Sequence, residues 1–269
     1  MISRAELQRL ANRENVALGI LEKDYVLTEV LKALSQVPEL RDVLVFKGGT
    51  ALRKVYFPGW RYSEDMDFSA RHDIMRQKLG QALEAWYRRV EQDSGVRLTT
   101  RMLHKLDGYA RVRIQFLGPL AYPGMVYMDL TFDEPLCLEP EYRRVLTAPF
   151  AGEERDILVY PLEELFAEKL RSLLERGKSR DYYDVWRFFK EHPAQADLEL
   201  LGAVLGKKLA HKGIRLHDTG GFLPADPGEL KSYWEQDLGQ QVSPLPPLDE
   251  VLEELRGMLD ELLSPHFPP

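Results

Sequence analysis

The sequence predicts a mixed α/β fold with a mixed, largely antiparallel sheet, followed by a helical C-terminal part. Three segments of the first half alternate apolar and polar residues, as half-buried strands do: 96–103, 111–116 and 126–133. From Pro161 onward the strong signals are helical, with apolar residues recurring at three- and four-residue intervals. We therefore expect an α/β domain over residues 1–155 and a helical domain over residues 156–269.

Local signals account for the other elements of the first part. Ser3 and Glu6 form a capping box, which predicts a short helix after them. The apolar spacing within 20–36 predicts a second helix. A short apolar run predicts a buried strand over 43–46. Chain breaks and periodicity predict three later elements: a helix over 50–56, a strand over 63–68 and a helix over 75–93.

The second part is predicted to contain several helices joined by short breaks. Gly177 ends the first of them, and Ser179 is expected to cap the second. An Asp-Pro pair and a proline-rich segment introduce the later ones. The predicted helices cover 161–176, 180–191, about 227–239, and 249–263.

Composition limits the classes of function. The chain has 269 residues and a formal net charge of −7, so nucleic-acid binding would need a local basic patch rather than general attraction. Such a group, Arg171, Arg176, Lys178 and Arg180, lies in one short segment, although most such runs are solvated faces. Cys137 is the only cysteine, which excludes an internal disulfide. No apolar run approaches membrane-spanning length and no signal-peptide core begins the chain, so the cytoplasm is the expected compartment, with no membrane partner.

A glycine pair and an acidic pair lie close together in the sequence. Gly48 and Gly49 follow an apolar run and can expose backbone N–H groups to a phosphate. If the segment 63–68 is extended, Asp65 and Asp67 share one face of a strand. Two carboxylates so close repel unless a cation lies between them, and Mg²⁺ completes its shell with water and phosphate oxygens. The combination indicates phosphoryl or nucleotidyl transfer, whereas each part alone is commonly a structural turn or a polar strand face.

Asp129 is a third candidate acid. It lies on the polar face of the predicted strand 126–133, which could pair with the strand over 63–68. A third acid beside an Asp-x-Asp pair suits a two-ion site. An ordinary solvent-facing aspartate explains the same spacing.

Lys169 lies within the apolar arc of the predicted helix 161–176. A lysine there either extends its amine to solvent or meets a buried negative charge, such as a phosphate or a carboxylate at a domain cleft. Asp181 and Asp184 share a face of the next helix, where the helix dipole alone explains Asp181. Asp184 lies among aromatic residues and is expected to pair with Lys169 or Arg180, or to act as a general base.

Four stretches share their order and spacing with one known family: EKDYVLTEVL (22–31), FKGGTALRKVY (46–56), RYSEDMDF (61–68) and EKLRSLLERGKSRDYYDVW (168–186). Together they resemble the AbiEii/AbiGii toxin family of nucleotidyltransferases, part of the DNA polymerase β-like superfamily. The resemblance implies a polymerase β-like nucleotidyltransferase domain followed by a helical domain.

The resemblance also implies roles for individual residues. The nucleotide-binding residues are Lys47, Gly48, Gly49, Thr50, Arg53 and Lys169. The metal ligands are Asp65, Asp67 and Asp129, and the catalytic residues are Asp65, Asp67, Lys169 and Asp184, with Asp181 as the alternative to Asp184.

The same resemblance implies an NTP donor, Mg²⁺, an RNA acceptor at the tRNA acceptor end, and a separately encoded antitoxin. In the expected mechanism a hydroxyl attacks the α-phosphate and pyrophosphate leaves, with Lys169 facing the acidic pair across a shared pocket. Two alternatives stay open. The acceptor hydroxyl belongs to a protein or a small molecule, or the chain is a catalytically silent module that retains a nucleotide pocket.

Overall fold

The structure, a computed structural model, divides into two compact units. It describes residues 1–71, 74–216 and 218–263. Unit 1 comprises Met1–Leu136 and Pro140–Tyr160, and unit 2 comprises Cys137–Glu139 and Pro161–Pro269. Within the described ranges, no helix combines the length and the apolar character needed to cross a bilayer.

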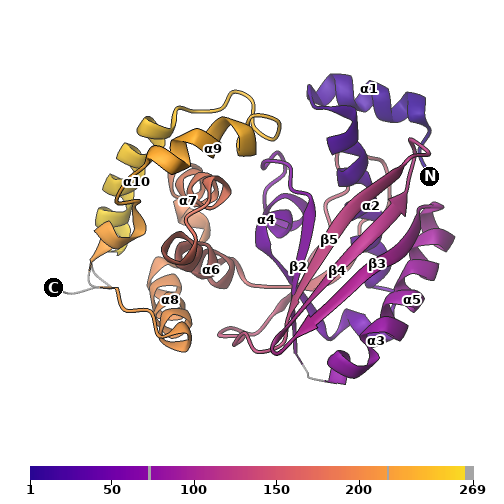
Figure 1. Cartoon of the computed structure of the whole chain (residues 1–269), viewed down its shortest axis with the longest axis horizontal. Helices are drawn as coiled ribbons and strands as arrows, with labels where there is room; N and C mark the ends of the chain where they lie inside the picture. Colours follow the sequence, from indigo (N-terminus) through magenta and orange to yellow (C-terminus); the bar gives the residue numbers. More distant parts are fainter. Residues whose placement is uncertain (72–73, 217, 264–269) are drawn as a thin grey trace. The chain divides into compact units, whose positions relative to one another are not determined.

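Unit 1 is built on a seven-stranded sheet in the order β3-β4-β5-β2-β1-β7-β6. Figure 1 labels four neighbouring strands of it, β3, β4, β5 and β2. Its strands are β1 (Leu44–Lys47), β2 (Asp65–Ala70), β3 (Arg97–Leu106), β4 (Tyr109–Leu117), β5 (Pro123–Thr131), β6 (Glu141–Arg144) and β7 (Asp156–Val159). The β2–β5 and β1–β7 pairs are parallel and the other neighbours are antiparallel. The predicted mixed, largely antiparallel sheet is confirmed. Strands β6 and β7 were not predicted, because each is too short to show a period.

Unit 1 also contains helices, and the last of them packs on the apolar face of the sheet. They are α1 (Arg4–Glu14), α2 (Leu18–Leu34), α3 (Pro38–Arg41), α4 (Gly48–Ala51), the π-helical η1 (Leu52–Tyr56) and α5 (Ile74–Ser94). Phe68 of β2 meets Trp86 of α5 edge to face, and the Trp86 indole donates a hydrogen bond of 2.9 Å to the Val30 carbonyl of α2. The predicted capping box is confirmed at its first bond, since the Ser3 side chain accepts from the backbone N–H of Glu6.

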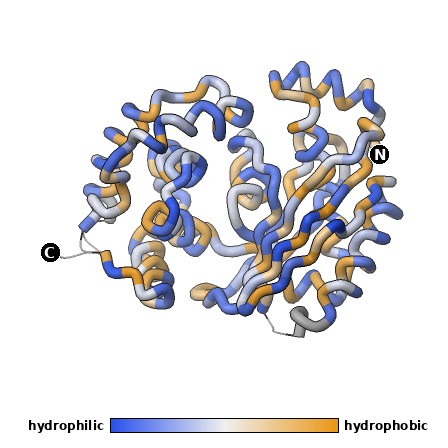
Figure 2. Tube along the Cα trace, in the orientation of Figure 1, coloured by the Kyte–Doolittle hydropathy of each residue, from blue (hydrophilic) through white to orange (hydrophobic). Residues whose placement is uncertain are grey.

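The strands carry the alternation that predicted them. Along β4, Val112, Ile114 and Phe116 are buried and alternate with more exposed polar residues, so hydrophobic and hydrophilic colours alternate along this strand (Figure 2). The polar side chains of β4 therefore lie on the face of the sheet opposite this apolar core.

Unit 2 is helical, as the sequence predicts. Its helices are α6 (Leu162–Glu175), α7 (Ser179–Glu191), η2 (Pro193–Gln195), α8 (Leu198–Lys212), η3 (Thr219–Phe222), α9 (Gly228–Leu238) and α10 (Leu248–Leu263). The rings of Phe166 and Phe188 stack at 3.6 Å between centroids and join α6 to α7. The prediction that Ser179 caps α7 is wrong. Lys178 occupies the cap position, and the Ser179 hydroxyl donates to Asp237 of α9 at 2.9 Å.

Candidate active site

The glycine pair begins a helix, whereas a separate turn was predicted before a helix at residue 50. Strand β1 ends at Lys47, and α4 starts at Gly48 and continues as η1. Gly48 has a φ of +80°, and a Cβ on it would lie 2.1 Å from Oδ2 of Asp67. Only glycine satisfies both conditions, so Gly48 lets the Asp67 carboxylate pack directly against the first helical turn.

Strand β2 presents its acids on one face, as predicted. Asp65 and Asp67 are half-buried, whereas Met66 between them is fully buried on the opposite face. The parallel β2–β5 register places Asp67 beside Asp129, and the antiparallel β1–β2 register places Lys47 on its other side. A row of polar side chains, Asp129, Asp67 and Lys47, therefore crosses three adjacent strands.

Asp129 has partners of its own. The Tyr109 hydroxyl donates a hydrogen bond to its Oδ1, and Nε of Arg111 lies 3.6 Å from the same oxygen. Burial raises the pKa of Tyr109, and the negative charges of Asp129 and Asp67 raise it further. The hydroxyl therefore stays protonated and donates to the carboxylate. Tyr109 and Arg111 thus fix the position of the Asp129 carboxylate next to Asp67. Its role as a metal ligand stays a prediction.

The acids of unit 1 do not form a preformed metal cage. Among the residues that the structure describes, no group of three or more His, Cys, Asp or Glu side chains converges closely enough to hold an ion. Mg²⁺ usually takes only one or two protein carboxylates and fills its shell with water and substrate phosphate. The neighbouring carboxylates of Asp67 and Asp129, with Asp65 on the same face, fit that mode of binding.

Thr50 and Arg53 are anchored inside unit 1. The Thr50 hydroxyl donates to the backbone carbonyl of Asp65 and so ties α4 to β2. Arg53 is buried, with Nε donating to Oδ1 of Asp24 at 3.1 Å and the guanidinium 3.6 Å from the Tyr62 ring centroid. These contacts hold both side chains in place, and their predicted contacts with a nucleotide stay predictions.

Three buried charged residues around this turn, Asp24, Lys54 and Arg61, were not predicted from the sequence. Asp24 of α2 binds Arg53 and also Lys54, whose Nζ lies 2.7 Å from Oδ2, and burial lowers the pKa of Lys54 in spite of this partner. Asp24 lies on the apolar face of the helix predicted over 20–36, and this position could have indicated a buried, paired aspartate. Arg61 is buried too, and its Nη2 lies 2.8 Å from where a Cβ on Gly49 would be. No local pattern distinguishes Arg61 from the other arginines.

Unit 2 holds the other candidate catalytic residues. Lys169 of α6 is only 7% exposed, and its Nζ lies 2.8 Å from Oδ2 of Asp184 and 3.5 Å from Oδ1 of Asp181, both on α7. The predicted pairing of Lys169 with Asp184 is confirmed. The amine therefore meets buried carboxylates and does not extend into solvent.

Asp181 has more than a helix-dipole role. Arg176 donates to both of its oxygens, from Nε at 2.9 Å and from Nη2 at 3.0 Å. Burial alone would raise the pKa of Asp181, but the Lys169 ammonium and the Arg176 guanidinium outweigh burial and hold this pKa below its usual range. Asp181 therefore stays ionised and shares Lys169 with Asp184.

The candidate residues thus fall into two sets. Asp65, Asp67 and Asp129 belong to unit 1, and Lys169 and Asp184 belong to unit 2. That the two sets meet at one triphosphate stays a prediction.

Comparison with known proteins identifies the family. The sequence profile described as nucleotidyl transferase AbiEii toxin, type IV toxin–antitoxin system, matches residues 29–254. The chain therefore belongs to this family of nucleotidyltransferase toxins, which confirms the resemblance and implies an NTP substrate and an antitoxin partner.

The fold also has a solved counterpart. MenT4, a nucleotidyltransferase toxin from Mycobacterium tuberculosis H37Rv, superposes with a TM-score of 0.70 at 21% identity, over 97% of this chain and 90% of that one. At this identity the likeness establishes the fold. No curated protein matches the sequence.

Proposed function

We propose that this chain transfers a nucleotide from an NTP to a hydroxyl group of RNA, at the acceptor end of a tRNA. Membership in the AbiEii family supports nucleotidyl transfer. The observation that carries the site assignment is the close approach of Gly48 to Asp67, which itself lies beside Asp129. This arrangement brings backbone N–H groups and carboxylates to one place, as binding of a triphosphate requires.

Each group of candidate site residues has a role in this reaction. Asp65 and Asp67, with Asp129, would hold Mg²⁺, which when bound polarises the α-phosphate and favours the ionised form of the attacking hydroxyl. The backbone N–H groups at the start of α4 orient the leaving phosphates. The Lys169 ammonium, held by Asp184, offsets the charge that builds on them.

The bond changes balance without any further reactant. The acceptor oxygen attacks the α-phosphorus in line and forms a new phosphodiester bond. The bond from the α-phosphorus to the bridging oxygen breaks, and pyrophosphate leaves with the electron pair. The hydroxyl proton passes to a base, for which the carboxylate of Asp184 is the candidate.

The test is to replace Asp67 with alanine and follow labelled NTP into total RNA in the presence of Mg²⁺. Asp67→Ala should lower transfer at least about 100-fold, as loss of one preorganised electrostatic group does. Asp156→Ala is the matched control, because Asp156 is an exposed aspartate on β7 of the same sheet. Wild-type transfer by Asp67→Ala would show that the site is elsewhere.

The same incubation identifies the acceptor. If the label enters total protein or small molecules and none enters RNA, the acceptor hydroxyl belongs to a protein or a small molecule and not to tRNA. No turnover with any NTP or acceptor would favour the silent module. The cytoplasm remains the expected compartment, and a separately encoded antitoxin the expected partner.

A further inference from the structure

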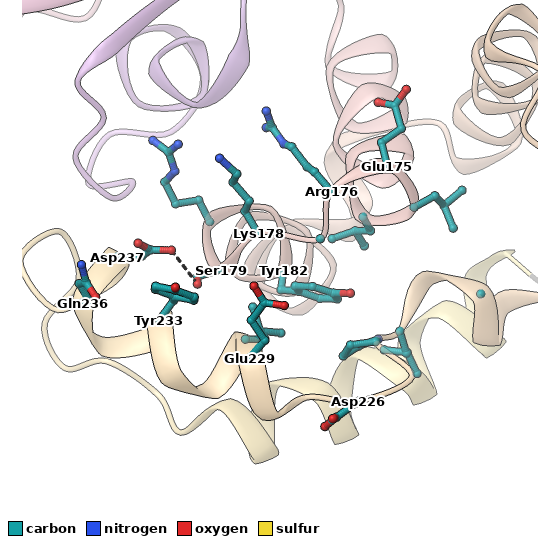
Figure 3. A pocket seen from close by; sticks show the side chains of 18 of the residues that line it. Glu175, Arg176, Lys178, Ser179, Tyr182, Asp226, Glu229, Tyr233, Gln236 and Asp237 are labelled. Carbon is teal, nitrogen blue, oxygen red and sulfur yellow. Dashed lines mark hydrogen bonds between the residues drawn. The ribbon is translucent and has the colours of Figure 1, made fainter.

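Unit 2 contains a cavity that the proposed chemistry does not use. It has a volume of about 870 Å³ and lies between the α6–α7 turn and α9. Figure 3 shows Arg176 and Lys178 projecting from the turn and Glu229 and Tyr233 projecting from α9. The volume lies towards the upper end of the roughly 300–1,000 Å³ range of ligand sites, so the cavity has room for more than a single ring.

One wall of the cavity is cationic. Arg176, Lys178 and Arg180 alternate along the turn that leads into α7. Arg176 is bound to Asp181, but the side chains of Lys178 and Arg180 form no hydrogen bond or ion pair within the described part of the chain. Two cations without internal partners are thus available to anionic groups, at the positive end of a thirteen-residue helix.

The opposite wall is aromatic and acidic. Tyr233 is 48% exposed, although it is large and partly apolar. Asp226 accepts from the backbone N–H of Gly228, and Asp237 accepts from Ser179. The Glu229 carboxylate has no hydrogen-bond or ion-pair partner among the described residues. This wall therefore offers a ring for stacking and an acceptor for N–H groups.

A nucleotide of a single strand matches both walls. Its phosphates need cations, its base stacks on an exposed aromatic ring, and an exocyclic amino group donates to a carboxylate. An acidic peptide matches only the cationic wall, because its carboxylates can neither stack on Tyr233 nor donate a hydrogen bond to Glu229. Lys178 and Arg180, two residues apart on one turn, suit successive phosphates of a strand better than one isolated nucleotide.

We propose that this cavity binds single-stranded RNA of the acceptor, with an amino-bearing base such as cytosine stacked on Tyr233 and donating to Glu229, and with phosphates at Lys178 and Arg180. The proposal rests on the proposed function, since it assigns the binding site for that acceptor. Uracil presents an oxygen where cytosine presents an amino group, so Glu229 discriminates between these two pyrimidines.

The test measures binding of fluorescent oligo(C) and oligo(U) RNA to the full chain by anisotropy, without NTP and at several salt concentrations. Lys178→Glu/Arg180→Glu should weaken oligo(C) binding at least about 10-fold and lower the salt slope by about 1.4, at about 0.7 for each phosphate contact with single strands. Lys207→Glu is the control, because Lys207 is an exposed lysine on α8 outside the cavity. Circular dichroism confirms that each variant is folded.

Two further variants test the opposite wall. Wild type should prefer oligo(C) to oligo(U) at least about 5-fold, and Glu229→Gln should reduce that preference. Tyr233→Ala should weaken the binding of both RNAs about 5-fold or more. Tyr233→Phe keeps the ring and should therefore keep the affinity. The proposal would be overturned if Lys178→Glu/Arg180→Glu bound oligo(C) RNA as tightly as wild type does. It would also be overturned if the wild-type chain bound an acidic peptide but neither RNA.

The outcome is separable from that of the proposed function. If Asp67→Ala keeps transfer, the proposed active site fails, while the anisotropy measurement still decides whether this cavity binds RNA. If Asp67→Ala loses transfer but the cavity variants bind as wild type does, only the binding site fails.

Discussion

Replacing Gly48 with alanine tests the turn on which the candidate site depends. The new Cβ would lie 2.1 Å from Oδ2 and 2.8 Å from Cγ of Asp67, at a residue whose φ is +80°. The substitution therefore acts in two ways, through the backbone conformation and through the Asp67 side chain.

The two contributions add to a measurable loss of stability. A left-handed conformation costs a non-glycine residue about 1–2 kcal/mol, and forcing an extra carbon into a packed site costs about 1–3 kcal/mol. Gly48→Ala should therefore lower the free energy of unfolding by about 2–5 kcal/mol. Transfer activity should fall as well, because Asp67 must leave its place beside the turn.

Chemical denaturation and the transfer assay measure the two effects. Gly80→Ala is the control, because a Cβ on Gly80 of α5 meets nothing within 4 Å and alanine is the better helix former. In an Asp67→Ala background the loss of stability caused by Gly48→Ala should be smaller, because the carboxylate is gone. It should not disappear, because the Cβ of residue 67, 2.9 Å from the new Cβ, remains. A Gly48→Ala protein with wild-type stability and transfer would refute the reasoning.

Two further predictions concern buried ion pairs of unit 2. Lys208 is fully buried with Nζ 2.8 Å from Glu164 and 2.9 Å from Glu168, so Lys208→Met should cost about 3–5 kcal/mol in denaturation, while the exposed neighbour Lys207→Met should change stability little. The pKa of Asp181 is lower in the folded than in the unfolded state, so its contribution is present above the unfolded value of about 3.9 and is lost as the pH falls through the folded pKa. Asp181→Asn should therefore be less stable at pH 7 and lose less stability in acid; equal acid sensitivity of the two proteins would contradict this.

Local patterns predicted most elements of the fold. The capping box at Ser3, the alternation along β4 and the helical arc around Lys169 all survive in the structure, because each depends on the backbone period of one segment. The patterns failed where an element is short, as in β6 and β7, and where a side chain has a distant partner. Ser179 is such a case, because its hydroxyl binds Asp237 instead of capping its own helix.

The sequence also does not show which of the clustered lysines and arginines are buried. Lys208 belongs to a run of cations on the sequence, yet it is buried between two glutamates and cannot belong to a solvated basic face. Lys178 and Arg180 have the same charge, and their side chains have no such partners among the residues that the structure describes. Composition does not distinguish the two cases, because burial depends on the helices that pack around each side chain.

The sequence by itself determined that Asp65 and Asp67 share one face of a strand and that a glycine pair precedes them, since both features are local. Only the tertiary structure decided that β5 lies parallel to β2 and brings Asp129 beside Asp67, and that Gly48 touches the Asp67 carboxylate. The reason is physical. The direction of a side chain follows from its own backbone, whereas its neighbours from distant segments follow from the packing of the whole core.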